Sequence, residues 1–293
     1  MFLRRHPYLF FLLILAGLGT VAMVSLAMVV VTVGGDSTDG GDKVGVIEIT
    51  GAIVDSQAII EELKAFREDE EVKAIVVRID SPGGGVGPSQ EIYREIRKTV
   101  AEKKVIVSMG SVAASGGYYV AAASDGIVAN PGTITGSIGV IMGYTNFEAL
   151  MQKIGLTPVV IKSGEYKDLG SPARPMTAKE KSLLEEVTRT IHRQFVEDIA
   201  AGRAMATDKV QAIADGRIFT GEEARKLGLV DRLGNFEDAV QWAGELGGIE
   251  GEVETIYPEK ERPSFIEYLL ESALHLWDQG GLRNRLAPAA IMR

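Results

Sequence analysis

Residues 72–85, which read VKAIVVRIDSPGGG, decide the fold of this chain. The β-branched run Val72–Ile79 is typical of a buried strand, and the three glycines that end the stretch indicate a tight turn. Residues 88–100 then follow a helical pattern. A strand, a turn and a helix in this order make up the repeating unit of a parallel sheet covered by helices.

The same alternation continues on both sides of this stretch. Further strands are predicted at Val44–Ile49, Lys104–Met109, Gly126–Ala129 and Pro158–Ile161. Further helices are predicted at residues 57–67, 118–123, 147–154, 178–201, 208–214 and 222–227. Strands that alternate with helices predict an α/β domain with a parallel sheet.

A long apolar segment lies near the N-terminus. Residues 8–33 carry no charged side chain over 26 positions, whereas about 20 residues suffice to cross a bilayer. The run is longer than the apolar core of about 7–15 residues in a cleavable signal peptide. We therefore expect one transmembrane signal-anchor helix, with its N-terminus in the cytoplasm because Arg4 and Arg5 precede it. Cleavage at a small-residue site such as Ser25-Leu26-Ala27 is the alternative.

Four segments are predicted along the chain. Residues 1–33 form the cytoplasmic flank and the anchor, and residues 34–42, GGDSTDGGD, form a flexible linker. Residues 43–250 form the globular domain, and residues 251–293 form a C-terminal tail with an amphipathic helix at 263–278. That helix can pack on the core, lie on a membrane surface or occupy the site as an inhibitor, and the residues leave all three open.

Composition excludes several classes of function. The formal net charge is −9, and an acidic chain does not favour nucleic acid as a partner, because phosphate binding needs a basic surface. The absence of cysteine rules out disulfides, a thiol nucleophile and a thiolate metal site. Since no metal-binding or nucleotide-binding motif is present either, we expect neither a metal nor a cofactor.

Histidine is a poor candidate for a general base in this chain. There are three histidines, and none lies beside a turn or a glycine-rich loop: His6, His192 and His275. A triad of serine, histidine and aspartate is therefore not favoured.

Ser115 is the best candidate for a nucleophile. It lies in the stretch Ala113–Gly117, between two alanines and two glycines at a helix start, so its hydroxyl is open to a substrate. The N–H of Gly116 follows within one peptide, as in other nucleophile turns, and the turn at residues 81–85 can present N–H groups to an oxyanion. The residues alone leave open that Ser115 is only a helix N-cap.

A serine without histidine needs another base, and a lysine can serve when its amine is neutral. Lys167 differs from most lysines of the chain, which lie in charged runs. It belongs to residues 162–172, KSGEYKDLGSP, in a loop after a predicted strand. An exposed loop lysine without a catalytic role is the alternative.

Five ordered motifs resemble the signal peptide peptidase A family of serine proteases. They are SPGGG at 81–85, SMGSVAASGGYYVA at 108–121, TGSIGV at 135–140, KSGEYKDLGSP at 162–172 and GRIFTGEEARKLGLVD at 216–231. The resemblance covers about residues 43–247. It implies a caseinolytic-protease/crotonase-like fold of stacked ββα units with a parallel sheet.

The resemblance also implies the roles of single residues. Ser115 matches the nucleophile, Lys167 matches the general base, and Ser137 matches a serine that orients the lysine. Gly83 or Gly84, together with Gly116, matches the residues that form the oxyanion hole in the family.

Members of this family assemble into rings. Longer members hold two copies of the domain, so this chain with one copy is expected to pair Ser115 with Lys167 of a neighbouring subunit. The implied substrates are apolar signal peptides left in the membrane, and the implied site is extracytoplasmic. A membrane protease with other substrates, a crotonase-like acyl-CoA enzyme and a non-catalytic membrane scaffold are the alternatives. The acyl-CoA enzyme leaves the serine–lysine pair and the membrane anchor unexplained, and in the scaffold Ser115 is only an N-cap.

Overall fold

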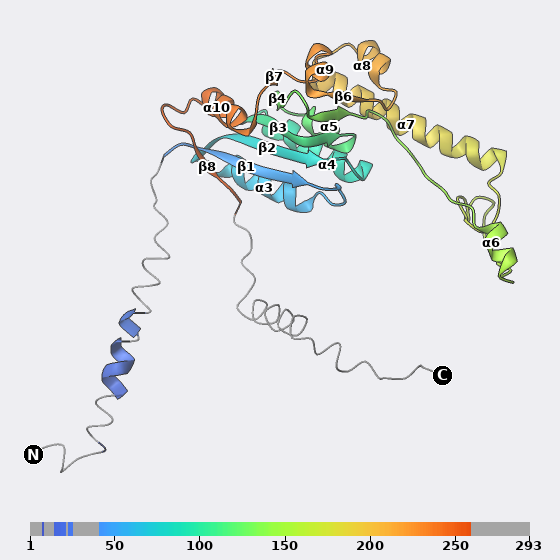
Figure 1. The fold of residues 1–293 in the computed structure, drawn as a ribbon, viewed down its shortest axis with the longest axis horizontal. Coiled ribbons are helices and arrows are strands. Elements are labelled where there is room, and N and C mark those ends of the chain that lie inside the picture. Colours follow the sequence, from blue (N-terminus) through green and yellow to red (C-terminus); the bar gives the residue numbers. More distant parts are fainter. Residues whose placement is uncertain (1–7, 9–14, 22, 26–40, 259–293) are drawn as a thin grey trace, which may run out of the picture. The chain divides into compact units, whose positions relative to one another are not determined.

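The structure is a computed structural model that describes residues 8, 15–21, 23–25 and 41–258 (Figure 1). The chain divides into two compact units, Met1–Gly41 and Asp42–Arg293. Most of the predicted anchor, most of the linker and the tail helix lie outside the described residues. Within the described part, no helix combines the length and the apolar composition needed to cross a membrane.

The second unit is built on one eight-stranded sheet (Figure 1). Its strands are β1 (Lys43–Thr50), β2 (Val72–Ser81), β3 (Lys104–Ala114), β4 (Gly126–Ala129), β5 (Ile134–Gly136), β6 (Ile218–Thr220), β7 (Arg232–Leu233) and β8 (Glu254–Ile256). The strand order is β6-β5-β3-β2-β1-β8, and β4 pairs with β3 and β7. Every pair is parallel except β5 with β6, so the predicted α/β fold with a parallel sheet is confirmed.

Helices cover both faces of this sheet. They are α3 (Gln57–Glu68), α4 (Val86–Thr99), α5 (Gly116–Ala121), α7 (Ala178–Gly202), α8 (Thr207–Ile213), α9 (Gly221–Lys226) and α10 (Phe236–Gly247). A further helix, α6 (Glu148–Lys153), has no buried residue and lies away from the sheet (Figure 1). One apolar cluster joins one face of the sheet to α3–α5 and α7–α9, and a second joins the other face to α10.

The burial of strand β2 on both faces explains why its sequence is apolar almost throughout. Ile75, Val77 and Ile79 point into the first cluster, whereas Ala74 and Val76 point into the second. Successive side chains of a strand face opposite sides, so a strand covered on both faces needs apolar residues at nearly every position.

Most predicted elements are present with small shifts at their ends. The strand predicted to end at Met109 continues to Ala114 as β3. Strands β5 and β6 were not predicted, because three residues are too few to show a period. Helix α10 was not predicted either.

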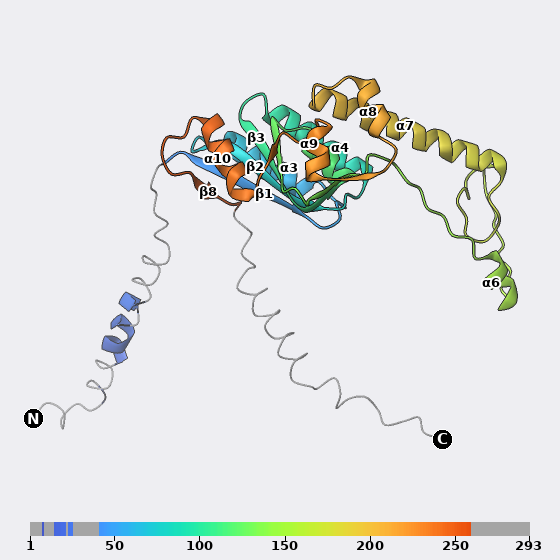
Figure 2. The same ribbon diagram turned by 45° about the horizontal axis from the view of Figure 1, so that its top comes forward.

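Residues 139–176 form an arm that leaves the body after β5 and returns to it through α7 (Figure 2). The strand predicted at Pro158–Ile161 is wrong, since these residues form no strand. Val159 and Ile161 are 82% and 98% exposed. A β-branched run becomes a strand only beside a partner, and no described strand pairs with this one.

Candidate active site

Ser115 sits at the junction of β3 and α5 in an unusual backbone conformation. Its φ of 52° and ψ of −119° lie where residues other than glycine are rarely found. Its N–H donates to the carbonyl oxygen of Gly136 at 2.9 Å. Although Ser115 occupies the N-cap position of α5, its side chain makes no capping hydrogen bond. The geometry is that of a sharp strand-to-helix turn that presents a hydroxyl.

The glycine turn after β2 lies directly against Ser115. A Cβ added to Gly83 would be 2.6 Å from the nitrogen of Gly116 and 2.8 Å from Cβ of Ser115. The φ of Gly83 is 99°, a value that also favours glycine. The backbone of this turn can approach the serine so closely because no side chain is present.

Two backbone N–H groups beside Ser115 are free to bind an anion. Gly116 is the first residue of α5, so its N–H has no acceptor within the helix. Neither this N–H nor that of Gly84 donates in a turn or loop hydrogen bond of the described chain. The N–H of Gly83 instead donates to Oγ of Ser81 at 3.1 Å. The arrangement therefore favours Gly84 and Gly116 over Gly83 as oxyanion donors.

Strand β5 brings Ser137 to the same place. Ala114 pairs with Gly136 in the ladder between β3 and β5. Ser115 and Ser137 are the next residues after this pair, so they lie at adjacent strand ends. Ser137 also has a positive φ, 50°, and its N–H donates to the carbonyl of Arg217 at 2.8 Å. The structure thus brings five of the six predicted site residues together.

A small pocket of about 20 Å³ opens at Ser115, enough for about one water-sized group. Its lining residues come from the glycine turn, α4, α5, the start of the arm and α7: Gly84, Val86, Ser89, Ser115, Gly116, Tyr119, Gly139, Val140, Ile191 and Phe195. The apolar members of this wall were not singled out in the sequence. Ile191 and Phe195 have the spacing of one helix face, but the spacing does not say that this face meets the serine.

Lys167 is the one predicted site residue that lies elsewhere. It belongs to the arm, where its N–H donates to the carbonyl of Gly164 at 3.2 Å. Its side chain is exposed, and it does not line the pocket at Ser115. Figure 2 shows the arm extending away from the body, so a single chain does not bring Lys167 to Ser115.

The loop around Lys167 is held by ion pairs. Asp168 accepts hydrogen bonds from Arg174 Nε at 2.9 Å and from Lys162 Nζ at 2.6 Å. These two partners hold the pKa of the Asp168 carboxyl well below its usual range. Arg174 also pairs with Glu180 in the first turn of α7, and Arg174 and Thr177 lower the pKa of Glu180 to about 2.

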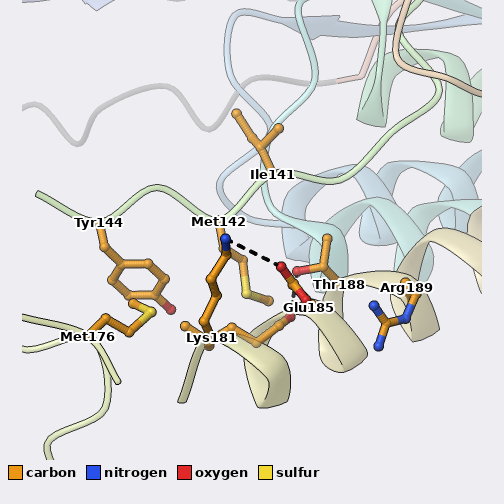
Figure 3. Close-up of a pocket in the computed structure, with 9 residues that line it drawn as sticks. Ile141, Met142, Tyr144, Met176, Lys181, Glu185, Thr188 and Arg189 are labelled. Atoms are coloured by element: carbon orange, nitrogen blue, oxygen red, sulfur yellow. Dashed lines mark hydrogen bonds and ion pairs between the residues drawn. The ribbon is translucent and has the colours of Figure 1, made fainter. Parts of the chain in front are cut away.

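A larger cavity of about 600 Å³ lies between the start of the arm and α7 (Figure 3). It is lined by Ile141, Met142, Tyr144, Met176, Lys181, Leu184, Glu185, Thr188 and Arg189. Lys181 and Glu185 form an ion pair of 3.9 Å at this cavity. Helix α7 therefore lines both this cavity and the pocket at Ser115.

Residues 97–250 match the model of Peptidase family S49, and residues 42–133 match that of Clp protease. The chain belongs to peptidase family S49. As a member of family S49 it is a serine-type peptidase of the signal peptide peptidase A kind, which confirms the resemblance seen in the motifs. Neither the acyl-CoA enzyme nor the non-catalytic scaffold is supported.

Individual relatives of this family S49 member agree with that assignment. A Synechocystis sp. protein provisionally named a protease is 49% identical over 210 residues, which are 71% of this chain and 76% of that protein. An Enterococcus faecium protein provisionally named signal peptide peptidase SppA is 40% identical over 63% of this chain and 54% of its own.

A solved structure shows the same fold. It is a mutant of the 1510-N membrane-bound stomatin-specific protease, with a TM-score of 0.51 at 19% identity, covering 75% of this chain and 99% of the other. With the match to the Clp protease model, it confirms the caseinolytic-protease-like fold.

Gly116→Ala is expected to lower kcat by about 10²–10³-fold, the usual effect of losing one oxyanion donor. The added Cβ would lie 2.5 Å from Ser89 Oγ and 3.1 Å from the nitrogen of Gly84, and would therefore push the two N–H donors apart. Steady-state hydrolysis of a fluorogenic peptide measures the change. Gly87→Ala is the control, because a Cβ there meets no atom within 4 Å. Equal kcat values for the two variants would contradict the proposed oxyanion hole.

Proposed function

We propose that this family S49 peptidase is a membrane-bound endopeptidase with Ser115 as nucleophile and Lys167 of a neighbouring subunit as general base. The strained turn at Ser115, with the free N–H groups of Gly84 and Gly116 beside it, carries the proposal. Ser137, which follows β5 beside it, would accept a hydrogen bond from the incoming lysine and orient its amine.

The reaction is an acyl transfer in two steps. The neutral amine of Lys167 takes the proton of Ser115, and Oγ attacks the peptide carbonyl while the N–H groups of Gly84 and Gly116 hold the oxyanion. The protonated lysine then gives its proton to the leaving amine, and water attacks the acyl-enzyme. Because the base must be deprotonated, activity is expected to rise toward alkaline pH.

The placement of Lys167 on the arm supports a site shared between subunits. The arm holds Lys167 away from Ser115 of the same chain, since Lys167 does not line the pocket at that serine. The arm also exposes large apolar side chains, among them Phe147, Leu150 and Ile154. Exposed apolar patches of this kind mark association surfaces, so a homo-oligomeric ring would both bury them and bring Lys167 to Ser115 of the next subunit.

The apolar segment at residues 8–33 is proposed to be a single transmembrane helix with a cytoplasmic N-terminus. It would hold the protease domain, residues 43–250, at the extracytoplasmic face of the cell membrane. The proposed substrates are signal peptides left in the membrane after their release from secreted proteins. Both the sequence motifs and the name of the Enterococcus faecium relative support this substrate class.

Two quenched fluorescent peptides test the substrate class. One carries a Leu/Ala core flanked by lysine, and the other has the same length with aspartate at every second core position. The full chain in detergent micelles is expected to cleave the apolar peptide with a kcat/KM at least about tenfold higher, since each apolar group placed in a matching pocket is worth roughly 1–3 kcal/mol. Equal kcat/KM values would reject apolar signal peptides as substrates and leave the serine chemistry standing.

A further inference from the structure

Arg174 lies between the loop that carries Lys167 and the first turn of α7. Its Nε donates to Oδ2 of Asp168 at 2.9 Å, and its Nη2 donates to the carbonyl oxygen of the same residue at 3.4 Å. Its Nη1 donates to Oε2 of Glu180 at 2.9 Å, and Nη2 donates to the other oxygen of that carboxylate. One guanidinium therefore joins the residue next to Lys167 to a helix.

Both carboxylates bound by Arg174 are themselves held in place. The side chain of Asp168 is only 12% exposed and also pairs with Lys162. Glu180 is buried, and its carboxylate accepts the backbone N–H of Thr177 at 2.8 Å as part of the capping box of α7. The connection from helix to loop thus runs through hydrogen bonds to groups with little freedom to move.

This network stabilises the arm and not the core of the body. Among the described residues, neither apolar cluster contains a member from 139–176. Tyr144 packs against Gly170, and the N–H of Phe147 donates to the carbonyl of Pro172 at 2.7 Å, so the loop also contacts the outgoing segment of the arm. Losing the arginine would therefore loosen the loop around Lys167 and leave the sheet intact.

We propose that Arg174 is a positioning residue that fixes the backbone next to Lys167 and so aims the catalytic amine at the serine of the neighbouring subunit. This inference rests on the proposed role of Lys167 as the base. An arginine is required because its planar fork binds Glu180 with two nitrogens and Asp168 with a third, whereas a lysine supplies one point charge. A base displaced by about 1 Å costs on the order of 10²-fold in rate.

Kinetics of the full chain in micelles separate positioning from stability. Arg174→Gln is expected to lower kcat by roughly 10²-fold with KM and the unfolding temperature of the body nearly unchanged, and Arg174→Lys should retain part of the lost rate. Arg193→Gln is the control: it removes an arginine of α7 whose ion pair with Glu197 is exposed. An unchanged kcat in Arg174→Gln, or a matching loss in Arg193→Gln, would overturn the proposal.

Oligomers assembled from two different variants show whether Arg174 acts on Lys167 or on Ser115. Arg174→Gln subunits keep a working Ser115, so adding S115A subunits, which supply an intact Lys167, should restore activity. Adding K167A subunits should not, because both partners then have a defective base. Restoration by both mixtures, or by K167A alone, would contradict the proposal.

A mixture of S115A with K167A tests the shared site by itself. If that mixture stays inactive, the proposal of a site shared between subunits is rejected. The positioning role of Arg174 is then tested by chemical rescue. Guanidinium ions added to Arg174→Ala should then raise its kcat and leave that of K167A unchanged. No response in Arg174→Ala would reject the positioning role.

Discussion

Ser115→Ala is expected to reduce peptide hydrolysis by about 10⁴-fold or more, the size of effect seen when a serine nucleophile is removed. In the proposed mechanism the hydroxyl forms the acyl-enzyme, whereas the N–H groups of Gly84 and Gly116, which donate in no turn or loop hydrogen bond of the described chain, would hold only the oxygen of the substrate. The turn should survive, because Ala adopts the positive φ of Ser115 at a cost similar to that of Ser. Turnover of the apolar peptide is the measurement, with circular dichroism to confirm the fold.

Ser111→Ala provides the matched control for this variant. Ser111 lies four residues earlier on β3, is exposed, and does not line the pocket at Ser115. Its activity should equal that of the wild type. Substantial activity in S115A would exclude Ser115 as the nucleophile and shift attention to Ser137, which shares its surroundings.

Lys167→Ala is expected to be nearly as inactive as S115A, because the amine is the only base proposed for the reaction and such residues act as a unit. The two inactive proteins should restore activity when they are mixed and allowed to assemble. In a ring with one Ser115 and one Lys167 at each interface, random one-to-one assembly leaves about a quarter of the sites intact. Turnover of the apolar peptide by the mixture measures this fraction.

Lys153→Ala serves as the control for loss of a lysine on the arm, since Lys153 closes α6 and lies outside the loop of Lys167. A mixture of S115A and K167A without activity would show that serine and lysine come from one subunit. The arm would then have to fold back toward the body, and the oligomer would lose its catalytic role.

The sheet was predictable because its strands are apolar on both faces. The run Val72–Ile79 is apolar at nearly every position, and its glycine turn lies at the end of the sheet where Ser115 is found. Pro158–Ile161 shows where this reasoning fails, because the same kind of residues remains unpaired and exposed. A strand depends on a neighbour, and the sequence of one segment does not contain that neighbour.

In the candidate site, too, some features could be predicted from the sequence and others could not. Ser115, Gly116 and the glycine turn could be found from small residues at a helix start, since steric freedom is a local property. The choice of Gly84 over Gly83 could not, because it depends on which N–H group is already bonded to Ser81. The apolar wall of Ile191 and Phe195 also needed the packing of α7 against α5.

By itself, the sequence determined the α/β class, the nucleophile candidate and the membership of family S49, because each depends on residue types at short spacing. Only the tertiary structure decided that Ser137 joins Ser115 and that Lys167 is held apart from both on an arm secured by Arg174. The physical reason is the distance along the sequence over which each feature arises. Strand patterns and turns depend on residues that are near neighbours in the chain. A site depends on contacts between distant segments, which only the packing of the sheet and its helices brings together.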